Sequence, residues 1–225
     1  MNKRYAIIVA GGSGLRFGGD VPKQFRLLCG RPVLMHTVDK FAAAGALVTL
    51  VLPEAHQTYW RELCNKYAFE TPHQVATGGS SRFESVCNGL SSLRLQPGDL
   101  VAIHDGVRPL VSRRLIDCAY ATASLHGSAI PAIAPTDSIR QVNPDGTSRQ
   151  LLRSELRAVQ TPQTFEASLL QGAYNVSYSP LFTDDASVVE AAGHAVTLID
   201  GESSNIKITH PADLLVAENL MNDGR

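Results

Sequence analysis

The chain has 225 residues, 44% of them hydrophobic, and a formal net charge of -1 at pH 7. This apolar content is ample for one α/β core, so we predict a single domain over residues 1–225. The near-neutral charge argues against a general nucleic-acid or membrane surface, because such surfaces usually carry a basic excess. The four cysteines are widely spaced, and the sequence shows no apolar run long enough for a signal peptide or a membrane span, so we expect a reduced, cytoplasmic protein.

Short apolar runs alternate along the chain with longer amphipathic segments, which is typical of βα units around a mostly parallel sheet. We predict strands at residues 5–10, 46–53, 73–77, 99–105, 128–134, 156–160 and 195–200. The predicted helices cover roughly residues 32–44, 54–68, 81–94, 112–126, 165–175, 184–192 and 211–222. This order indicates an α/β fold without internal repeats.

The first predicted strand leads into a glycine-rich loop, and the whole stretch reads AIIVAGGSGLRFGGDVPKQF at residues 6–25. Loops of this kind let backbone N–H groups approach a phosphate. The loop does not fit the dinucleotide fingerprint GxGxxG, because Phe17 stands where a very small residue is favoured. It does not fit the P-loop either, because Asp20 and Val21 stand where Lys and Ser/Thr are required.

Two cations, Arg16 and Lys23, belong to this loop, and residues 1–40 contain seven cationic and two acidic residues. In nucleotidyl transfer, negative charge builds on the α-phosphate and on the departing pyrophosphate, and cations held in place stabilise it. We therefore predict that the loop closes both cations over a triphosphate. The alternative is an ordinary turn with solvated cations.

A second Gly-Gly turn, in GGSSRFESV at residues 78–86, leads into a helix that carries Arg82 and Ser85 near its start. Amides and hydroxyls at this place can contact a base or support a phosphate, although many helices simply begin after Gly-Ser. The segment alone leaves these two interpretations open.

The stretch VAIHDGVRP at residues 101–109 ends a predicted strand with Asp105, and Arg108 follows one turn later. Open α/β sheets bind ligands at the carboxyl ends of their strands. We expect Asp105 to contact a ribose, a substrate hydroxyl or Mg²⁺, and we expect His104 to be a core residue or to support the site from behind.

Residues 135–155 interrupt the βα pattern with a polar segment that contains an Asn-Pro-Asp-Gly turn. Two polar extended runs around such a turn predict a β-hairpin. An isolated hairpin is marginal in water, so we expect this one to pack on something, such as another subunit. A mobile surface loop is the alternative.

Three C-terminal motifs add further candidates. QTPQTF places Thr161 after a strand, and FTDDASVVE places Thr183 beside Asp184 and Asp185 at a helix start, where acidic residues also suit capping. NIKITHPADL carries Lys207 between two isoleucines in a short β-like stretch. A buried lysine needs a partner for its charge, and a phosphate would serve.

Taken in order, AGGSGLRFG, PKQF, GGSSRFESV, HDGVRP, QTPQTF, TDDASVVE and NIKITHPADL resemble one family over almost the whole chain. These are the cytidylyltransferases that make 4-diphosphocytidyl-2-C-methylerythritol from CTP and 2-C-methylerythritol 4-phosphate in non-mevalonate isoprenoid synthesis. The resemblance implies a single Rossmann-like, three-layer α/β domain of the nucleotide-diphospho-sugar transferase type. It also implies a Mg²⁺-dependent reaction, with other divalent cations possible, and a homodimer joined by an arm that matches residues 135–155.

Carried over by position, the resemblance assigns Arg16 and Lys23 to transition-state stabilisation, and Arg153 and Lys207 to positioning the substrate phosphate. It places the nucleotide against Ala10, Gly11, Gly12, Gly14, Gly79, Arg82, Ser85 and Gly106. It places methylerythritol phosphate against Asp105, Arg108, Ser138, Thr161 and Thr183. If the arm is exchanged between subunits, Ser138 and Arg153 act in the partner's site. The resemblance leaves the metal ligands unknown.

The mechanism implied is direct in-line attack of the substrate phosphate on the α-phosphorus of CTP, because the motifs include no Ser/His/Asp or Cys/His set. The nearest alternative is ribitol-5-phosphate cytidylyltransferase, which shares several of the motifs, although the TDDASVVE segment favours the isoprenoid enzyme. A transferase for another sugar phosphate is a second alternative, which the PKQ and NIKIT segments disfavour. From another class, a module that binds CTP without turnover is a further alternative.

Overall fold

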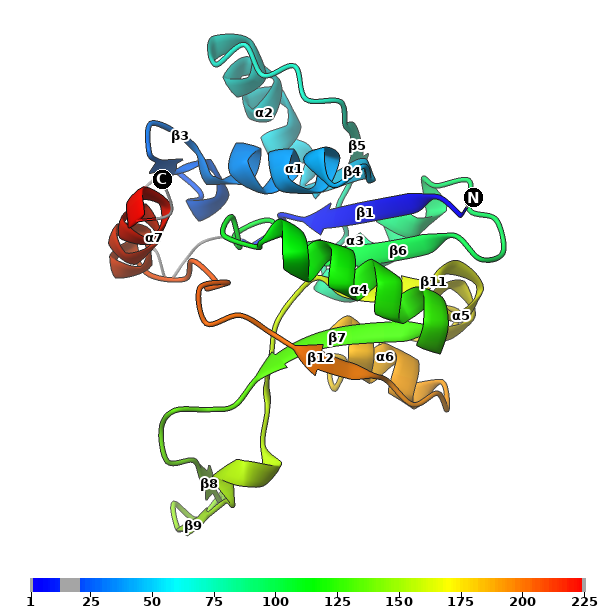
Figure 1. The fold of residues 1–225 in the computed structure, drawn as a ribbon, viewed down its shortest axis with the longest axis vertical. Coiled ribbons are helices and arrows are strands. Elements are labelled where there is room, and N and C mark those ends of the chain that lie inside the picture. Colours follow the sequence, from blue (N-terminus) through cyan, green and yellow to red (C-terminus); the bar gives the residue numbers. More distant parts are fainter. Residues whose placement is uncertain (1, 13–20, 224–225) are drawn as a thin grey trace.

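The computed structural model describes residues 2–12 and 21–223, and Figure 1 shows its fold. Two predicted site residues, Gly14 and Arg16, therefore lie outside the described residues. In the described part of the chain, no helix combines the length and the apolar character that crossing a membrane would require.

The described residues form a central eight-stranded sheet in the order β10-β7-β11-β6-β1-β4-β5, with β12 beside β7. The strands are β1 (Arg4–Val9), β4 (Leu47–Leu52), β5 (Gln74–Thr77), β6 (Leu100–Asp105), β7 (Ser128–Ile133), β10 (Ala158–Val159), β11 (Gln163–Glu166) and β12 (Leu198–Asp200). The pairs β5–β4, β4–β1, β1–β6 and β12–β7 are parallel, whereas β11 and β10 run antiparallel to their neighbours. The mostly parallel sheet predicted from the sequence is confirmed.

Helices cover both faces of this sheet (Figure 1). They are α1 (Val33–Ala43), α2 (Glu54–Lys66), α3 (Arg82–Ser91), α4 (Arg113–His126), α5 (Ala167–Ala173) and α6 (Asp185–Ala191). The helix α7 (Pro211–Asp223) lies beyond the end of the sheet, where its Ala217 packs with Leu28 and Ile208. Alternating side chains of β1 separate the two cores: Ala6 and Ile8 pack with α1, α2 and α4, whereas Tyr5 and Ile7 pack with α3, α5 and α6. This alternation gives the three-layer α/β fold.

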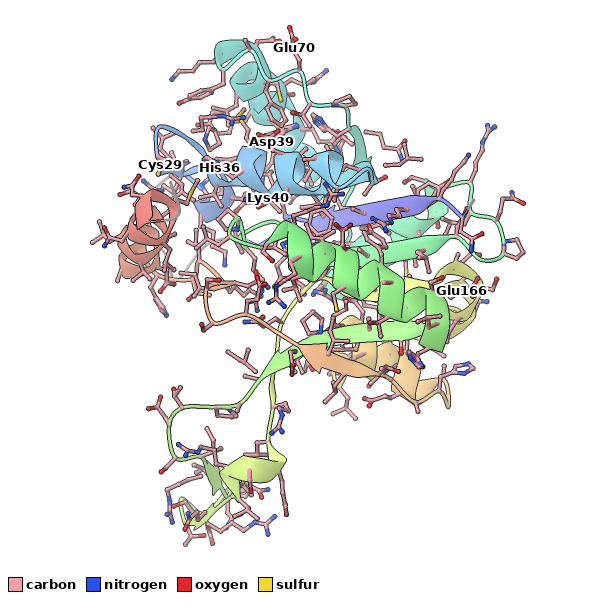
Figure 2. The ribbon with its side chains drawn as sticks, viewed as in Figure 1. Cys29, His36, Asp39, Lys40, Glu70 and Glu166 are labelled. Carbon is pink, nitrogen blue, oxygen red and sulfur yellow. The ribbon has the colours of Figure 1, made fainter. Side chains whose placement is uncertain are left out.

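The strand β11 corrects the expectation that a helix begins at residue 165. Gln163–Glu166 instead pairs antiparallel with both β6 and β7, and α5 begins only at Ala167. The small hairpin of β2 (Leu27–Leu28) and β3 (Arg31–Pro32) was also not predicted. Its turn is at Cys29 and Gly30, which both have positive φ, and Figure 2 labels Cys29.

Residues 135–155 contain the predicted hairpin, formed by β8 (Arg140–Val142) and β9 (Ser148–Gln150). Its turn closes where the Gly146 N–H donates to the Asn143 carbonyl at 3.0 Å, and Gly146 has φ +83°, a value that favours glycine. The arm projects from the sheet, and in Figure 2 its side chains stand away from the rest of the chain. The hairpin prediction is confirmed.

Candidate functional site

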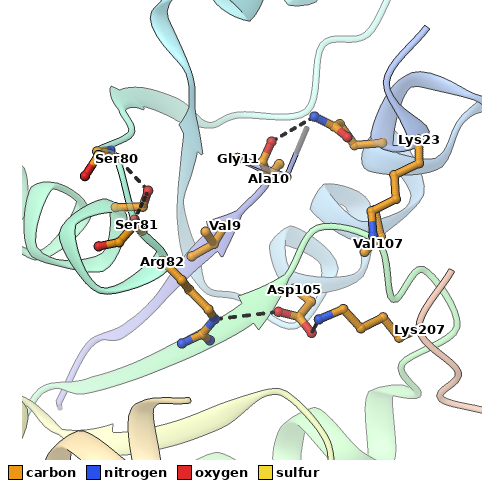
Figure 3. Close-up of a pocket in the computed structure, with 14 residues that line it drawn as sticks. Val9, Ala10, Gly11, Lys23, Ser80, Ser81, Arg82, Asp105, Val107 and Lys207 are labelled. Atoms are coloured by element: carbon orange, nitrogen blue, oxygen red, sulfur yellow. Dashed lines mark hydrogen bonds and ion pairs between the residues drawn. The ribbon is translucent and has the colours of Figure 1, made fainter. Parts of the chain in front are cut away.

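A pocket of about 250 Å³ opens at the carboxyl ends of β1 and β6 (Figure 3). It is lined by Val9, Ala10, Gly11, Gly12, Lys23, Gln24, Gly79, Ser80, Ser81, Arg82, Ser85, Asp105, Val107 and Lys207. The pocket thus brings together predicted residues from five separate motifs. Sequence reasoning did not select Val9, Gln24, Ser80, Ser81 or Val107.

The Gly-Gly turn before α3 forms one wall by close backbone approach. A Cβ added to Gly79 would lie 2.3 Å from the Glu84 Cβ, so only glycine fits there without rearrangement. The Gly79 N–H donates to the Ser85 hydroxyl at 3.1 Å, and that hydroxyl donates to the Ser81 carbonyl at 2.9 Å. Ser85 therefore fixes the turn. Ser81 also caps α3, so this segment is both a helix start and a pocket wall.

Gly106 follows β6 at a point where three chain segments meet. Its N–H donates to the Val9 carbonyl at 2.9 Å, and its own carbonyl accepts a hydrogen bond from the Thr37 hydroxyl at 3.0 Å. An added Cβ would lie 3.0 Å from the Ala10 Cβ and 2.9 Å from Leu34. Glycine is therefore needed here for close packing between the ends of β1 and β6.

Asp105 is the centre of the charge distribution in the pocket. Its carboxylate lies 3.0 Å from the Lys207 ammonium, 3.3 Å from the Arg108 Nε and 3.9 Å from the Arg82 Nε. Burial alone would raise the pKa of Asp105, but the charges of Lys207, Arg82 and Arg108 outweigh it and hold that pKa well below the ordinary value. Asp105 is thus ionised and surrounded by cations that can also attract phosphate.

The structure corrects the expectation for Lys207. Its side chain is 42% exposed, so the lysine is not buried and does not need a phosphate to compensate for burial of its charge. Its charge partner in the structure is Asp105. The stretch around it is not a strand, but Ile208 is buried and its N–H donates to the Val107 carbonyl at 2.9 Å. Because Ile208 is anchored in the core formed with α7, the side chain of Lys207 is directed into the pocket.

Arg82 is held by a buried partner that is 103 residues away in the sequence. It forms two hydrogen bonds with the Asp185 carboxylate, at 2.8 and 2.6 Å, and the Tyr174 hydroxyl donates to the same carboxylate at 2.6 Å. Burial would lower the pKa of Arg82, but Asp185 raises it. Asp184 caps α6, whereas Asp185 is fully buried and is the charge partner of Arg82, so the capping alternative is correct only for Asp184.

A buried relay of hydrogen bonds supports Asp105 from behind. The His104 Nε2–H donates to the Arg108 carbonyl at 3.1 Å, which leaves Nδ1 to accept from the Thr161 hydroxyl at 3.0 Å. The same hydroxyl accepts from the Asp105 N–H at 3.1 Å. His104 is a core residue, as expected, and Thr161 contacts the backbone of Asp105 without lining the pocket.

Burial lowers the pKa of His104 to about 4 from an ordinary value of 6.5. The unfolded chain therefore binds a proton that the folded chain excludes, and this residue should cost stability as the pH falls from 6.5 toward 4. Between pH 7 and pH 5 we expect the parent to lose about 2 kcal/mol more unfolding free energy than the His104→Gln variant. Urea unfolding at both pH values measures this, and equal losses in the two proteins would contradict it.

Six predicted residues of the described part of the chain do not line the pocket. Gly106, Arg108 and Thr161 contact its wall from behind, through Val9 and Asp105, whereas Ser138, Arg153 and Thr183 make no such contact. Ser138 and Arg153 line a separate surface hollow on the arm, where the Arg153 guanidinium donates to the Thr136 carbonyl. Thr183 is exposed in the loop before α6. Within one chain, Ser138 and Arg153 therefore belong to a different hollow from the other predicted residues.

Comparisons with known proteins show the family to which the chain belongs. The family described as 2-C-methyl-D-erythritol 4-phosphate cytidylyltransferase matches residues 5–223. The Porphyromonas gingivalis protein of that name is 50% identical over 220 residues, which cover 97% of this chain and 98% of that protein.

Two solved structures also cover nearly the whole chain. The 4-diphosphocytidyl-2C-methyl-D-erythritol synthase from Anaerococcus prevotii gives a TM-score of 0.81 at 27% identity and covers 98% of this chain and 99% of its own. The 2-C-methyl-D-erythritol 4-phosphate cytidylyltransferase from Thermus thermophilus gives 0.76 at 31% identity with the same coverage. The chain therefore belongs to the 2-C-methyl-D-erythritol 4-phosphate cytidylyltransferase family.

Proposed function

We propose that the pocket binds CTP beside 2-C-methyl-D-erythritol 4-phosphate and joins them to give 4-diphosphocytidyl-2-C-methyl-D-erythritol. An oxygen of the 4-phosphate forms a bond to the α-phosphorus of CTP, the bond from that phosphorus to the bridging oxygen breaks, and the electron pair leaves with pyrophosphate. One observation carries the proposal: Lys23, Lys207 and the backbone of residues 10–12 line the same pocket. The family match favours this substrate over ribitol 5-phosphate and over CTP binding without turnover.

Catalysis in this proposal comes from positioning and electrostatics. Lys23, together with Arg16, stabilises the charge that develops on the triphosphate. Lys207 and Arg153 position the attacking phosphate. In the absence of substrate, Asp105 orients Lys207 through their 3.0 Å ion pair. The backbone N–H groups of residues 10–12 and of Gly79 supply further donors for the nucleotide.

We propose Mg²⁺ as the metal of the reaction. The described residues contain no group of three or more His, Cys, Asp or Glu that could hold a metal, and Asp105 is the one carboxylate among the described residues that line the pocket. Mg²⁺ commonly takes one or two carboxylates and fills its other positions with substrate phosphates and water. Lys207, Arg108 and Arg82 already surround the Asp105 carboxylate, so the substrate phosphates and water would supply most of the ligands, and the metal, when bound, would neutralise triphosphate charge.

We also propose that the chain works as a homodimer of single domains in the cytoplasm. The exposed arm at residues 135–155 would carry Ser138 and Arg153 into the partner's pocket, which they do not reach within their own chain. The exposed Val142 and Leu152 of the arm are apolar surface that such a contact would cover. The four free cysteines suit a reducing compartment.

Pyrophosphate release tests the proposed reaction directly. Purified protein with Mg²⁺ and CTP should release pyrophosphate much faster with 2-C-methyl-D-erythritol 4-phosphate than with ribitol 5-phosphate, because the former is the substrate named for the family. A preference for ribitol 5-phosphate would keep the chemistry and overturn the substrate. If neither substrate gives release although the protein binds CTP measurably, the proposal that the protein is an enzyme would be overturned.

A further inference from the structure

Gln24 is a buried polar side chain in the wall of the pocket. Only 1% of its surface is exposed, and its Nε2 donates to the Ala10 carbonyl at 2.9 Å. Ala10 belongs to the segment of residues 9–12 that lines the pocket, and Lys23 directly precedes Gln24 in the chain. The hydrogen bond therefore links the segment that carries the proposed catalytic cation to the segment proposed to hold the nucleotide.

The local backbone explains why the neighbouring side chains of residues 23–25 point in different directions. Lys23–Phe25 is a 3₁₀ helix, in which successive side chains point about 120° apart. Lys23 and Gln24 both line the pocket, whereas the buried Phe25 packs beneath α2, with ring centroids 5.2 Å from Tyr59 and 6.3 Å from Trp60. The short helix is thus anchored on one side by an aromatic cluster and on the other by the Gln24 amide.

The contact at Ala10 fixes both partners because Ala10 is itself tied to the sheet. Its N–H donates to the Val51 carbonyl of β4 at 3.0 Å, so its carbonyl has a defined place. An amide that donates to this carbonyl sets the distance from β1 to the Lys23 helix. A cation that stabilises a transition state must be held closely, because a displacement of about 1 Å can cost about 100-fold in rate.

We infer that Gln24 is a positioning residue that holds the Lys23 ammonium in register with the Ala10–Gly12 backbone. The inference rests on the proposed role of Lys23. It assigns to Gln24 an effect on turnover that passes through Lys23, in addition to the ordinary stabilising effect of a buried hydrogen bond.

The test uses Gln24→Met, which keeps the length of the side chain and removes the donor. We expect kcat for pyrophosphate release to fall by about 10- to 100-fold, with the equilibrium Kd for CTP changed by less than about threefold. The matched control is Tyr120→Phe, which removes a buried donor to the Tyr5 carbonyl, 2.7 Å away at the other end of β1. This control should lose stability and keep kcat.

A double variant separates positioning from damage. In the Lys23→Ala background, Gln24→Met should lower kcat by less than about threefold, because the group that it positions is gone. An equal loss in both backgrounds, or a loss no larger than that of Tyr120→Phe, would overturn the inference. Parental turnover in Lys23→Ala alone would instead overturn the proposed role of Lys23.

If Gln24→Met does not fold, Gln24→Glu gives a second test. A buried carboxyl has a raised pKa, and only its protonated form can donate to the Ala10 carbonyl. The kcat of Gln24→Glu relative to the parent should therefore rise as the pH is lowered from about 8 to about 6. A ratio that stays flat or falls over this range would count against the inference.

Discussion

Lys23→Ala is expected to lower kcat for pyrophosphate release by about 100- to 1000-fold while the protein stays folded. Lys23 is half-buried and lines the pocket, so its ammonium can be held near the phosphates where negative charge develops. An exposed, solvated cation would give a far smaller effect, because water screens it. Steady-state kinetics with both substrates measure the loss, and thermal unfolding checks the fold.

Lys40→Ala is the matched control for this variant. Lys40 belongs to the same basic N-terminal segment, but it is exposed on α1, where Figure 2 labels it, and it is not among the residues that line the pocket. Its removal changes net charge equally and should leave kcat within about twofold of the parent. Near-parental turnover in Lys23→Ala, or an equal loss in Lys40→Ala, would show that Lys23 does not stabilise the transition state.

Arg153→Ala and Lys23→Ala are expected to be nearly inactive alone and to restore activity when their subunits are mixed. In a mixed dimer with exchanged arms, one of the two sites receives Lys23 from one chain and Arg153 from the other. Random exchange makes half of the dimers mixed, so about a quarter of the sites should regain full activity. The measurement is pyrophosphate release after the two proteins are unfolded and refolded together.

Two outcomes would contradict the exchanged arm. If Arg153 acts in its own chain, mixing restores nothing above the sum of the separate proteins. A hydrodynamic mass that corresponds to a monomer at working concentration would exclude the shared site altogether. Arg149→Ala, which removes another exposed arginine of the arm, is the control. It should keep its activity, and mixing it with Lys23→Ala should give no more activity than the sum of the two separate proteins.

The fold was largely predictable because its signals are local. Apolar runs and amphipathic segments place the parallel strands and their helices, and the turn at Asn143–Gly146 marks the hairpin. The strand β11 was missed because only four residues form it, and they run directly into α5. Its strand character depends on β6 and β7, which already lie on either side of it.

The candidate site was predictable where a motif carries its own chemistry, as the cations and glycines of the pocket do. The partners of these residues were less predictable, because they come from distant parts of the chain. Nothing in the sequence around Arg82 indicates Asp185, and the exposure of Lys207 follows from the anchoring of Ile208. Gln24 was missed because a glutamine beside a lysine carries no signal of burial.

The arm has a consequence for how this chain tolerates change. The sheet holds the two ends of the arm side by side, since Ile133 of β7 pairs with Ala158 of β10. The entropy of closing the intervening loop is therefore offset by β-sheet pairing, and it grows only slowly with loop length. Insertions or deletions within the arm should leave the three-layer core intact, so the length of the arm can vary independently of the stability of the domain that bears it.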